Sequence, residues 1–116
     1  MTNIIREITP EVLYQWLKNE RILLIDVREP YEFLSNCIDG AINIPLSCLL
    51  TEIDKLNIST NTKIILQCAV GVRSMRACQL LQENTPLHNL YNLKGGIIQW
   101  SAQNLPVNSN QHLRAS

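Results

Sequence analysis

The sequence has no surplus of charge of either sign. Ten basic residues balance ten acidic ones in a chain of 116 residues, so the formal net charge is zero. Without a basic surplus, nothing indicates binding to nucleic acid or to an anionic membrane surface. Long apolar runs are also missing, since runs such as residues 22–25 and 64–66 are far shorter than a membrane span. Residues 1–6 show no basic segment followed by an apolar stretch and a cleavage site, so we expect a cytoplasmic protein.

Cysteine is present, but not at the spacings that bind metals. The four cysteines are Cys37, Cys48, Cys68 and Cys78. None forms a CxxC pair, and the two histidines lie far from most of them, so we expect no metal site. Because nothing indicates export, we expect reduced thiols rather than disulfides. No motif points to a cofactor, and we expect none.

Short apolar runs alternate with amphipathic stretches along the chain. Helices are predicted from Pro10 onward, with Thr9 as N-cap, and then over residues 30–34, 46–56, 73–83 and 97–103. Strands are predicted over residues 4–8, 22–26, 42–44, 63–67 and 87–93. This alternation is typical of an α/β domain with a mostly parallel sheet. We assign residues 1–107 to one domain and residues 108–116 to a polar C-terminal tail.

The segment CAVGVRS, from Cys68 to Ser74, joins a predicted buried strand to a predicted helix. In parallel sheets, ligands bind beyond the carboxyl ends of the strands. A cysteine at this place can point its sulfur at backbone N–H groups, which stabilise a thiolate together with the helix dipole. Gly71 permits a positive φ, and Arg73 adds a cation whose fork suits oxyanions. We therefore predict that Cys68 is a nucleophile that needs no histidine partner.

Each cysteine also has a plainer interpretation. Free cysteines are more often buried packing residues than nucleophiles, and Cys68 could simply end a strand. The pattern Cys-x-x-Gly-x-Arg-Ser between a strand and a helix favours the nucleophile instead. Cys78 falls in the middle of the next predicted helix, and we interpret both Cys78 and Cys48 as structural.

Three motifs follow one another along the chain. The first is DVREPYEF from Asp26, with IDGAINIP from Ile38 after it. The second is CAVGVRS, and the third is LKGGIIQW from Leu93, with LPV from Leu105 after it. In this order and at these spacings, over residues 8–107, the sequence resembles the rhodanese family of sulfurtransferases.

The resemblance implies a three-layer domain, with a five-stranded, mostly parallel sheet and helices on both faces. It also implies that Cys68 takes a sulfane sulfur from a donor, carries it as a persulfide and passes it to a thiophilic acceptor. The backbone amides of residues 69–73 would cradle the persulfide, and Arg73 would order the loop and help to bind anionic donors. The expected substrate-binding or anion-binding loop is Ala69, Val70, Gly71, Val72, Arg73 and Ser74.

Two further pairs of residues match the family pattern. Asp26 and Arg28 match its DVR element, and we interpret them as a supporting ion pair near the site, of the exposed kind that contributes little. Gly95 and Gly96 match the turn before the closing helix and are interpreted as structural.

The chain departs from the family pattern at two places. Cys37 stands where a histidine is usual, which we interpret as a structural change, although a second reactive thiol is the sharper hypothesis. Ala69 and Val70 stand where many relatives carry arginine or lysine. Less positive charge predicts weaker capture of a small dianion such as thiosulfate. The expected partners are thiosulfate or a persulfide as small sulfur donor, with a protein donor or acceptor as the alternative.

Two other functions compete with sulfur transfer. A phosphatase or arsenate reductase of the same fold needs a larger cup, and phosphatase relatives have five residues between cysteine and arginine. Only four residues separate Cys68 from Arg73, which suits a single sulfur atom.

A non-catalytic binding module is the other alternative. Inactive relatives usually lose the cysteine, and a docking role for Tyr31 and Phe33 is outweighed by the interpretation of both as core aromatics.

Overall fold

The computed structural model describes residues 5–109, and its centre is a five-stranded parallel sheet. The strands are β1 (Arg6–Ile8), β2 (Ile22–Asp26), β4 (Ile42–Asn43), β5 (Lys63–Gln67) and β6 (Leu90–Leu93). Their order in the sheet is β1-β6-β5-β2-β4, and every neighbouring pair is parallel. The α/β fold with a parallel sheet is therefore confirmed.

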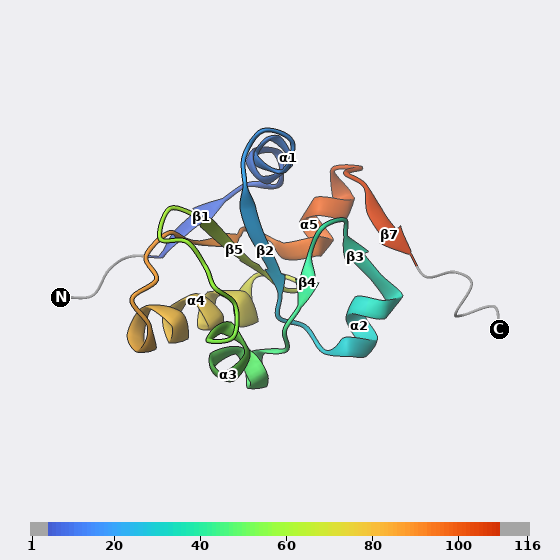
Figure 1. The fold of residues 1–116 in the computed structure, drawn as a ribbon. Helices are drawn as coiled ribbons and strands as arrows, with labels where there is room; N and C mark the ends of the chain where they lie inside the picture. The colour runs from blue at the N-terminus through green and yellow to red at the C-terminus, as the bar shows by residue number, and fades with distance from the viewer. Residues whose placement is uncertain (1–4, 110–116) are drawn as a thin grey trace.

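The helices are α1 (Pro10–Asn19), α2 (Pro30–Ser35), α3 (Leu49–Ile53), α4 (Val72–Asn84) and α5 (Gly96–Ala102). Helices α1 and α5 lie on one side of the sheet, and α3 and α4 lie on the other (Figure 1). Thr9 caps α1 as predicted, since its Oγ1 accepts a hydrogen bond from the N–H of Val12 at 3.3 Å. The predicted helix over 46–56 is instead a 3-10 turn, η1 (Leu46–Cys48), followed by the short α3.

The sheet separates two apolar clusters. The cluster under α3 and α4 includes Ile25, Leu66 and Leu81, and the cluster under α1 and α5 includes Leu13, Ile65 and Trp100. Strands β2 and β5 contribute to both clusters, which explains their continuous apolar runs. Helices therefore cover both faces of the central strands.

A second, two-stranded sheet was not predicted from the sequence. Strand β3 (Asn36–Ile38) pairs antiparallel with β7 (Val107–Ser109). Each strand has only three residues, too few for an alternating pattern to stand out. The last two residues of β7, 108 and 109, belong to the predicted tail. Residues 110–116 and the predicted strand residue Ile4 lie outside the described part.

The carboxyl ends of β2 and β5 are neighbours. Asp26, the last residue of β2, pairs in register with Gln67, the last residue of β5. The segments that follow the two strands therefore leave the sheet at the same edge, and these are the segments that begin with Val27 and Cys68. Within the described residues, no helix is long and apolar enough to cross a membrane.

Candidate active site

Cys68 lies at the carboxyl end of β5, at the entrance to the loop that leads into α4. Its side chain is almost completely buried, with 1% exposed. Gly71 is the N-cap residue of α4 and has a φ of +106°, so the predicted positive φ is confirmed. A residue with a side chain rarely adopts this backbone conformation, and the loop turns back on itself here because a glycine is present.

The sulfur of Cys68 accepts hydrogen bonds from the loop. The N–H of Gly71 donates to Sγ at 3.1 Å, and the N–H of Ser74 donates at 3.4 Å. Gly71 offers no side chain to cap α4, so the thiol sulfur takes the place of the capping oxygen for the first turn of this helix. The Oγ of Ser74 lies 3.3 Å from the same sulfur. Of these two N–H donors, Gly71 lies within the predicted cradle of residues 69–73, and Ser74 lies one residue beyond it.

The pKa of the Cys68 thiol lies below its usual range as the balance of opposing effects. Burial is the largest influence and raises the pKa. The Ser74 hydroxyl and the backbone N–H groups of Ser74, Gly71 and Val70 lower it, and together they outweigh burial. A lowered pKa increases the thiolate fraction at neutral pH, and the thiolate is the nucleophilic form.

The amino end of α5 holds the same loop from behind. The N–H groups of Ile97 and Ile98 donate to the carbonyl oxygens of Cys68 and Ala69 at 3.0 and 3.1 Å. A Cβ added to Gly96 would stand 2.4 Å from the Ala69 oxygen, so this close approach requires glycine. The pair Gly95–Gly96 is thus structural, as predicted, and it supports the loop that follows Cys68.

Arg73 is already paired, which the sequence did not predict. Its guanidinium donates two hydrogen bonds to the carboxylate of Glu32 on α2, at 2.8 and 3.0 Å. The bonded Arg73 side chain lowers the pKa of Glu32 to about 2, against the opposing effect of burial, and Glu32 raises the pKa of Arg73. Arg73 orders the loop by tying it to α2, and its charge is balanced there.

Asp26 and Arg28 form a buried ion pair rather than the exposed pair that the sequence analysis predicted. Asp26 is 0% and Arg28 4% exposed. The guanidinium donates to both carboxylate oxygens, and it also reaches the backbone oxygen of Asn36 at 2.7 Å. The pair therefore ties the segment after β2 to β3 beside the site. Buried charges remain acceptable only when paired and hydrogen-bonded in this manner.

Asn92 is a second residue of the site that the sequence analysis missed. It is fully buried in β6, and its Oδ1 accepts a hydrogen bond from the hydroxyl of Ser74 at 2.5 Å. Its Nδ2 donates to the carbonyl oxygen of Gly71 at 3.1 Å and to the carboxylate of Glu7 at 3.0 Å. A polar residue between Tyr91 and Leu93 in a buried strand was the available signal, because such groups need partners.

The other three cysteines lie in different surroundings. Cys78 is fully buried in α4, and burial, with a smaller effect of Glu7, raises its pKa to about 12. Cys37 is buried in β3, and burial followed by the charge of Asp26 raises its pKa. These surroundings favour the structural interpretation of both thiols over a reactive one.

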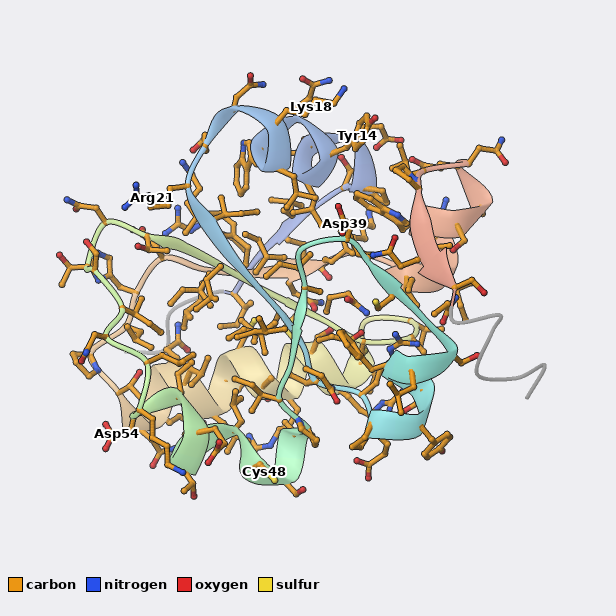
Figure 2. All side chains as sticks on the ribbon, turned by 45° about the vertical axis from the view of Figure 1, so that its right-hand side comes forward. Tyr14, Lys18, Arg21, Asp39, Cys48 and Asp54 are labelled. Carbon is orange, nitrogen blue, oxygen red and sulfur yellow. The ribbon has the colours of Figure 1, made fainter. Side chains whose placement is uncertain are left out.

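Cys48 differs from the other cysteines because it is exposed. Figure 2 shows it on η1, at the opposite end of the molecule from Tyr14 and Lys18 of α1. The prediction of a packing role for Cys48 is therefore wrong. Its sulfur lies 3.8 Å from the Oγ of Ser47, and all four cysteines are free thiols.

The outer surface of the loop is apolar. Val70 and Val72 are 54% and 73% exposed, so their side chains face outward. Tyr31 on α2 is 74% exposed, which corrects its interpretation as a core aromatic, and Ile98 on α5 is 59% exposed. A hollow of about 300 Å³ opens beside Arg73.

Within residues 5–109, no group of three or more His, Cys, Asp or Glu side chains could hold a metal ion.

Comparisons with known proteins agree with this architecture. The family model described as "Rhodanese-like domain" matches residues 9–103. A sulfurtransferase of Allochromatium vinosum is 33% identical over 105 residues, which are 90% of this chain and 95% of that protein. The uncharacterised protein YqhL of Bacillus subtilis is 48% identical over 80 residues, 69% of this chain, and the match spans only 61% of YqhL.

A solved structure shows the same fold. The crystal structure of a rhodanese-related protein from Thermoplasma volcanium superposes with a TM-score of 0.77 at 33% identity, covering 89% of this chain and 97% of that one. The motifs around Cys68, the sheet order and these matches agree with one another, and the chain belongs to the rhodanese-like family.

Proposed function

We propose that this protein is a sulfurtransferase that carries a sulfane sulfur as a persulfide on Cys68. The observation that carries the proposal is the cup of N–H donors from Gly71 and Ser74 around the buried Cys68 sulfur, with the lowered pKa that it produces. The activity named for the Allochromatium vinosum relative supports the same class of reaction. We propose that the reaction takes place in the cytoplasm, where free thiols such as these persist.

The reaction consists of two displacements at sulfur. The Cys68 thiolate attacks the sulfane sulfur of the donor, a new S–S bond forms, and the donor's own bond to that sulfur breaks. The leaving thiolate or sulfite keeps the electron pair of the broken bond. An acceptor nucleophile then attacks the outer sulfur, and Cys68 leaves as a thiolate. Neither step needs a general base on the protein when the thiolate is already formed.

The loop donors act on the charge that appears in each step. Preorganised N–H groups stabilise an anion without having to reorient during the reaction. The N–H groups of Gly71 and Ser74 point at Sγ in the resting state, so they are in place when Cys68 leaves as a thiolate. The amino end of α4 adds its dipole at the same point.

The charges around the loop favour a persulfide donor over thiosulfate. Arg73 is the cation nearest the sulfur along the loop, and its charge is balanced by Glu32. Val70 and Val72 present apolar side chains on the outer surface. A dianion gains little electrostatic attraction at such a surface. A small-thiol or protein persulfide carries less charge at its reacting sulfur and depends less on that attraction.

The loop geometry supports sulfur transfer over phosphate or arsenate chemistry. The N–H groups of Gly71 and Ser74 already contact Sγ directly, at 3.1 and 3.4 Å. A tetrahedral oxyanion above the sulfur would need these donors to face its oxygens, in a wider loop. The contacts present fit one sulfur atom.

The proposal is tested by intact-mass analysis of the reduced protein after incubation with thiosulfate and, separately, with glutathione persulfide. We expect one added sulfur from the persulfide, less from thiosulfate, and removal of that sulfur by cyanide. Cys68→Ser should gain none, while Cys78→Ala should gain as much as the wild type. A folded wild-type protein that gains no sulfur from either donor would contradict the proposal and favour the non-catalytic binding module.

A further inference from the structure

The orientation of the Asn92 side-chain amide is fixed by its neighbours. Two acceptors, the carbonyl oxygen of Gly71 and the carboxylate of Glu7, lie 3.1 and 3.0 Å from Nδ2. Turning the amide over would place its oxygen against both acceptors, so the NH₂ group must face them. The Oδ1 atom therefore faces the Ser74 hydroxyl, 2.5 Å away. An amide oxygen can only accept, so the hydrogen in this contact belongs to Ser74.

A hydroxyl has one hydrogen, and two acceptors compete for the hydrogen of Ser74. One is Oδ1 of Asn92, and the other is the Cys68 sulfur at 3.3 Å. While the hydrogen points to Asn92, the hydroxyl turns a lone pair toward Sγ. That lone pair can accept the S–H hydrogen of the thiol, but it offers nothing to the thiolate. The hydroxyl stabilises the thiolate only after its hydrogen has turned from Asn92 to the sulfur.

We propose that Asn92 competes with Cys68 for the single hydroxyl hydrogen of Ser74, and that Asn92 is thereby a positioning residue that controls how readily the Cys68 thiol ionises. Asn92 has two opposite effects on Cys68. Through Nδ2 it holds the Gly71 carbonyl, which keeps the neighbouring N–H aimed at Sγ. Through Oδ1 it withholds the Ser74 hydroxyl hydrogen from the sulfur. The inference goes beyond the proposed function, since ionisation of Cys68 can be measured without any sulfur donor.

Several charged and titratable groups lie near the contact between Ser74 and Asn92, and the ionisation of Cys68 is the one that the experiment follows. Glu7 on β1 bonds to the far side of the Asn92 amide, and a carboxylate there polarises Oδ1 as an acceptor. Cys78 on α4 has its pKa raised to about 12, and Arg73 at the start of α4 has its pKa raised by Glu32. The pKa of Glu32 itself is about 2. Across pH 5 to 9, none of these last three groups changes its charge.

The test is a double-mutant cycle on Asn92→Leu and Ser74→Ala, read from the pH dependence of Cys68 alkylation by iodoacetamide. Peptide mass spectrometry follows each cysteine separately, and circular dichroism confirms the fold. The midpoint of the profile reports ionisation of Cys68, and the plateau at high pH reports access to it. We expect Asn92→Leu to lower the midpoint, with about tenfold more thiolate at pH 6, which corresponds to about one pKa unit. With Ser74→Ala already present there is no hydroxyl hydrogen to release, so Asn92→Leu should no longer lower the midpoint.

A merely structural role for Asn92 gives the opposite pattern. Loss of Asn92 would then loosen the loop, which would raise the midpoint of the alkylation profile and change its plateau. The changes would be equal with and without the Ser74 hydroxyl. That result would overturn the proposal. If Asn92→Leu does not fold, the smaller Asn92→Ala serves in its place, since it also removes Oδ1 and adds no charge. Asn92→Ala should likewise lower the midpoint when Ser74 is present but not when it is alanine, and equal shifts would contradict the competition.

Discussion

Cys68 and Cys78 are both buried and belong to the same apolar cluster, yet the pKa of Cys68 is lowered and the pKa of Cys78 is raised to about 12. Burial acts in the same direction on both. The difference is the backbone around them, because Cys68 precedes α4 and receives its unpaired N–H groups, whereas Cys78 lies where these groups are used within the helix. The position of a thiol relative to a helix end, more than its depth, decides whether it can react.

The largest expected effect is the difference in sulfur uptake between a substitution of Cys68 and a substitution of Cys78. Cys68→Ser should abolish sulfur uptake, while Cys78→Ala should keep it within about twofold and lower the free energy of unfolding by about 1 kcal/mol, because a small buried group is lost. Sulfur uptake by intact mass and urea denaturation give the two readouts. Loss of uptake in a folded Cys78→Ala protein would break the distinction between the two thiols.

The next effect concerns the glycine that supports the loop. Gly96→Ala should reduce the free energy of unfolding by about 3 kcal/mol or more and raise the pKa of Cys68, since its Cβ would meet the Ala69 oxygen at 2.4 Å. Gly40→Ala is the matched control, because Gly40 also has a positive φ but no atom within 4 Å of an added Cβ. It should cost only about 1–2 kcal/mol for the backbone conformation, with no change in the pKa of Cys68. Equal effects of the two substitutions would contradict a supporting role for α5.

A smaller effect concerns the contact between the loop and α2. The pKa of Glu32 falls from 4.5 to about 2 in the folded protein, chiefly through its hydrogen bonds from Arg73. Because the folded pKa is the lower one, this contribution is complete above pH 4.5 and is lost as the pH falls from 4.5 to about 2. Solvent screening at the partly exposed Arg73 keeps the contribution to about 1 kcal/mol.

Glu32→Gln should remove this part of the pH dependence of stability, measured by urea denaturation at a series of pH values. Glu52→Gln is its control, because the Glu52–Lys55 pair is exposed and should contribute almost nothing. An unchanged acid profile in Glu32→Gln would show that the Arg73–Glu32 contact does not stabilise the loop.

The smallest expected effect belongs to the most accessible thiol. Cys48 is exposed and receives no hydrogen bond from a backbone N–H group among the described residues. Cys48→Ser should therefore leave the rate of sulfur uptake within about twofold of the wild type and the stability within about 0.5 kcal/mol. A large loss of uptake would mean that exposure, rather than the loop donors, selects the reacting cysteine.

The sequence predicted the parts of this protein that depend on neighbouring residues. Cys68, Gly71 and Ser74 lie within one short segment, and the cup that they form follows from a strand, a tight turn and a helix start in succession. The alternation of apolar runs and amphipathic stretches likewise predicted the parallel sheet.

The parts that the sequence did not predict depend on distant contacts. Glu32 is separated from Arg73 by 41 positions, and Asn92 from Ser74 by 18, so no local pattern joins them. Arg28 of the buried ion pair reaches the backbone oxygen of Asn36 on β3, a strand too short to recognise by periodicity. A polar residue inside a predicted buried strand, as Asn92 is, was the signal that such contacts existed.

The most direct test of the central claim is a competition among the four cysteines in one sample of the wild-type protein. The reduced protein is treated with a limiting amount of glutathione persulfide, the thiols and persulfides are trapped, and peptide mass spectrometry locates the added sulfur. The account predicts sulfur on the Cys68 peptide, with little on the peptides of Cys37, Cys48 or Cys78. Sulfur found mainly on the exposed Cys48 would contradict it.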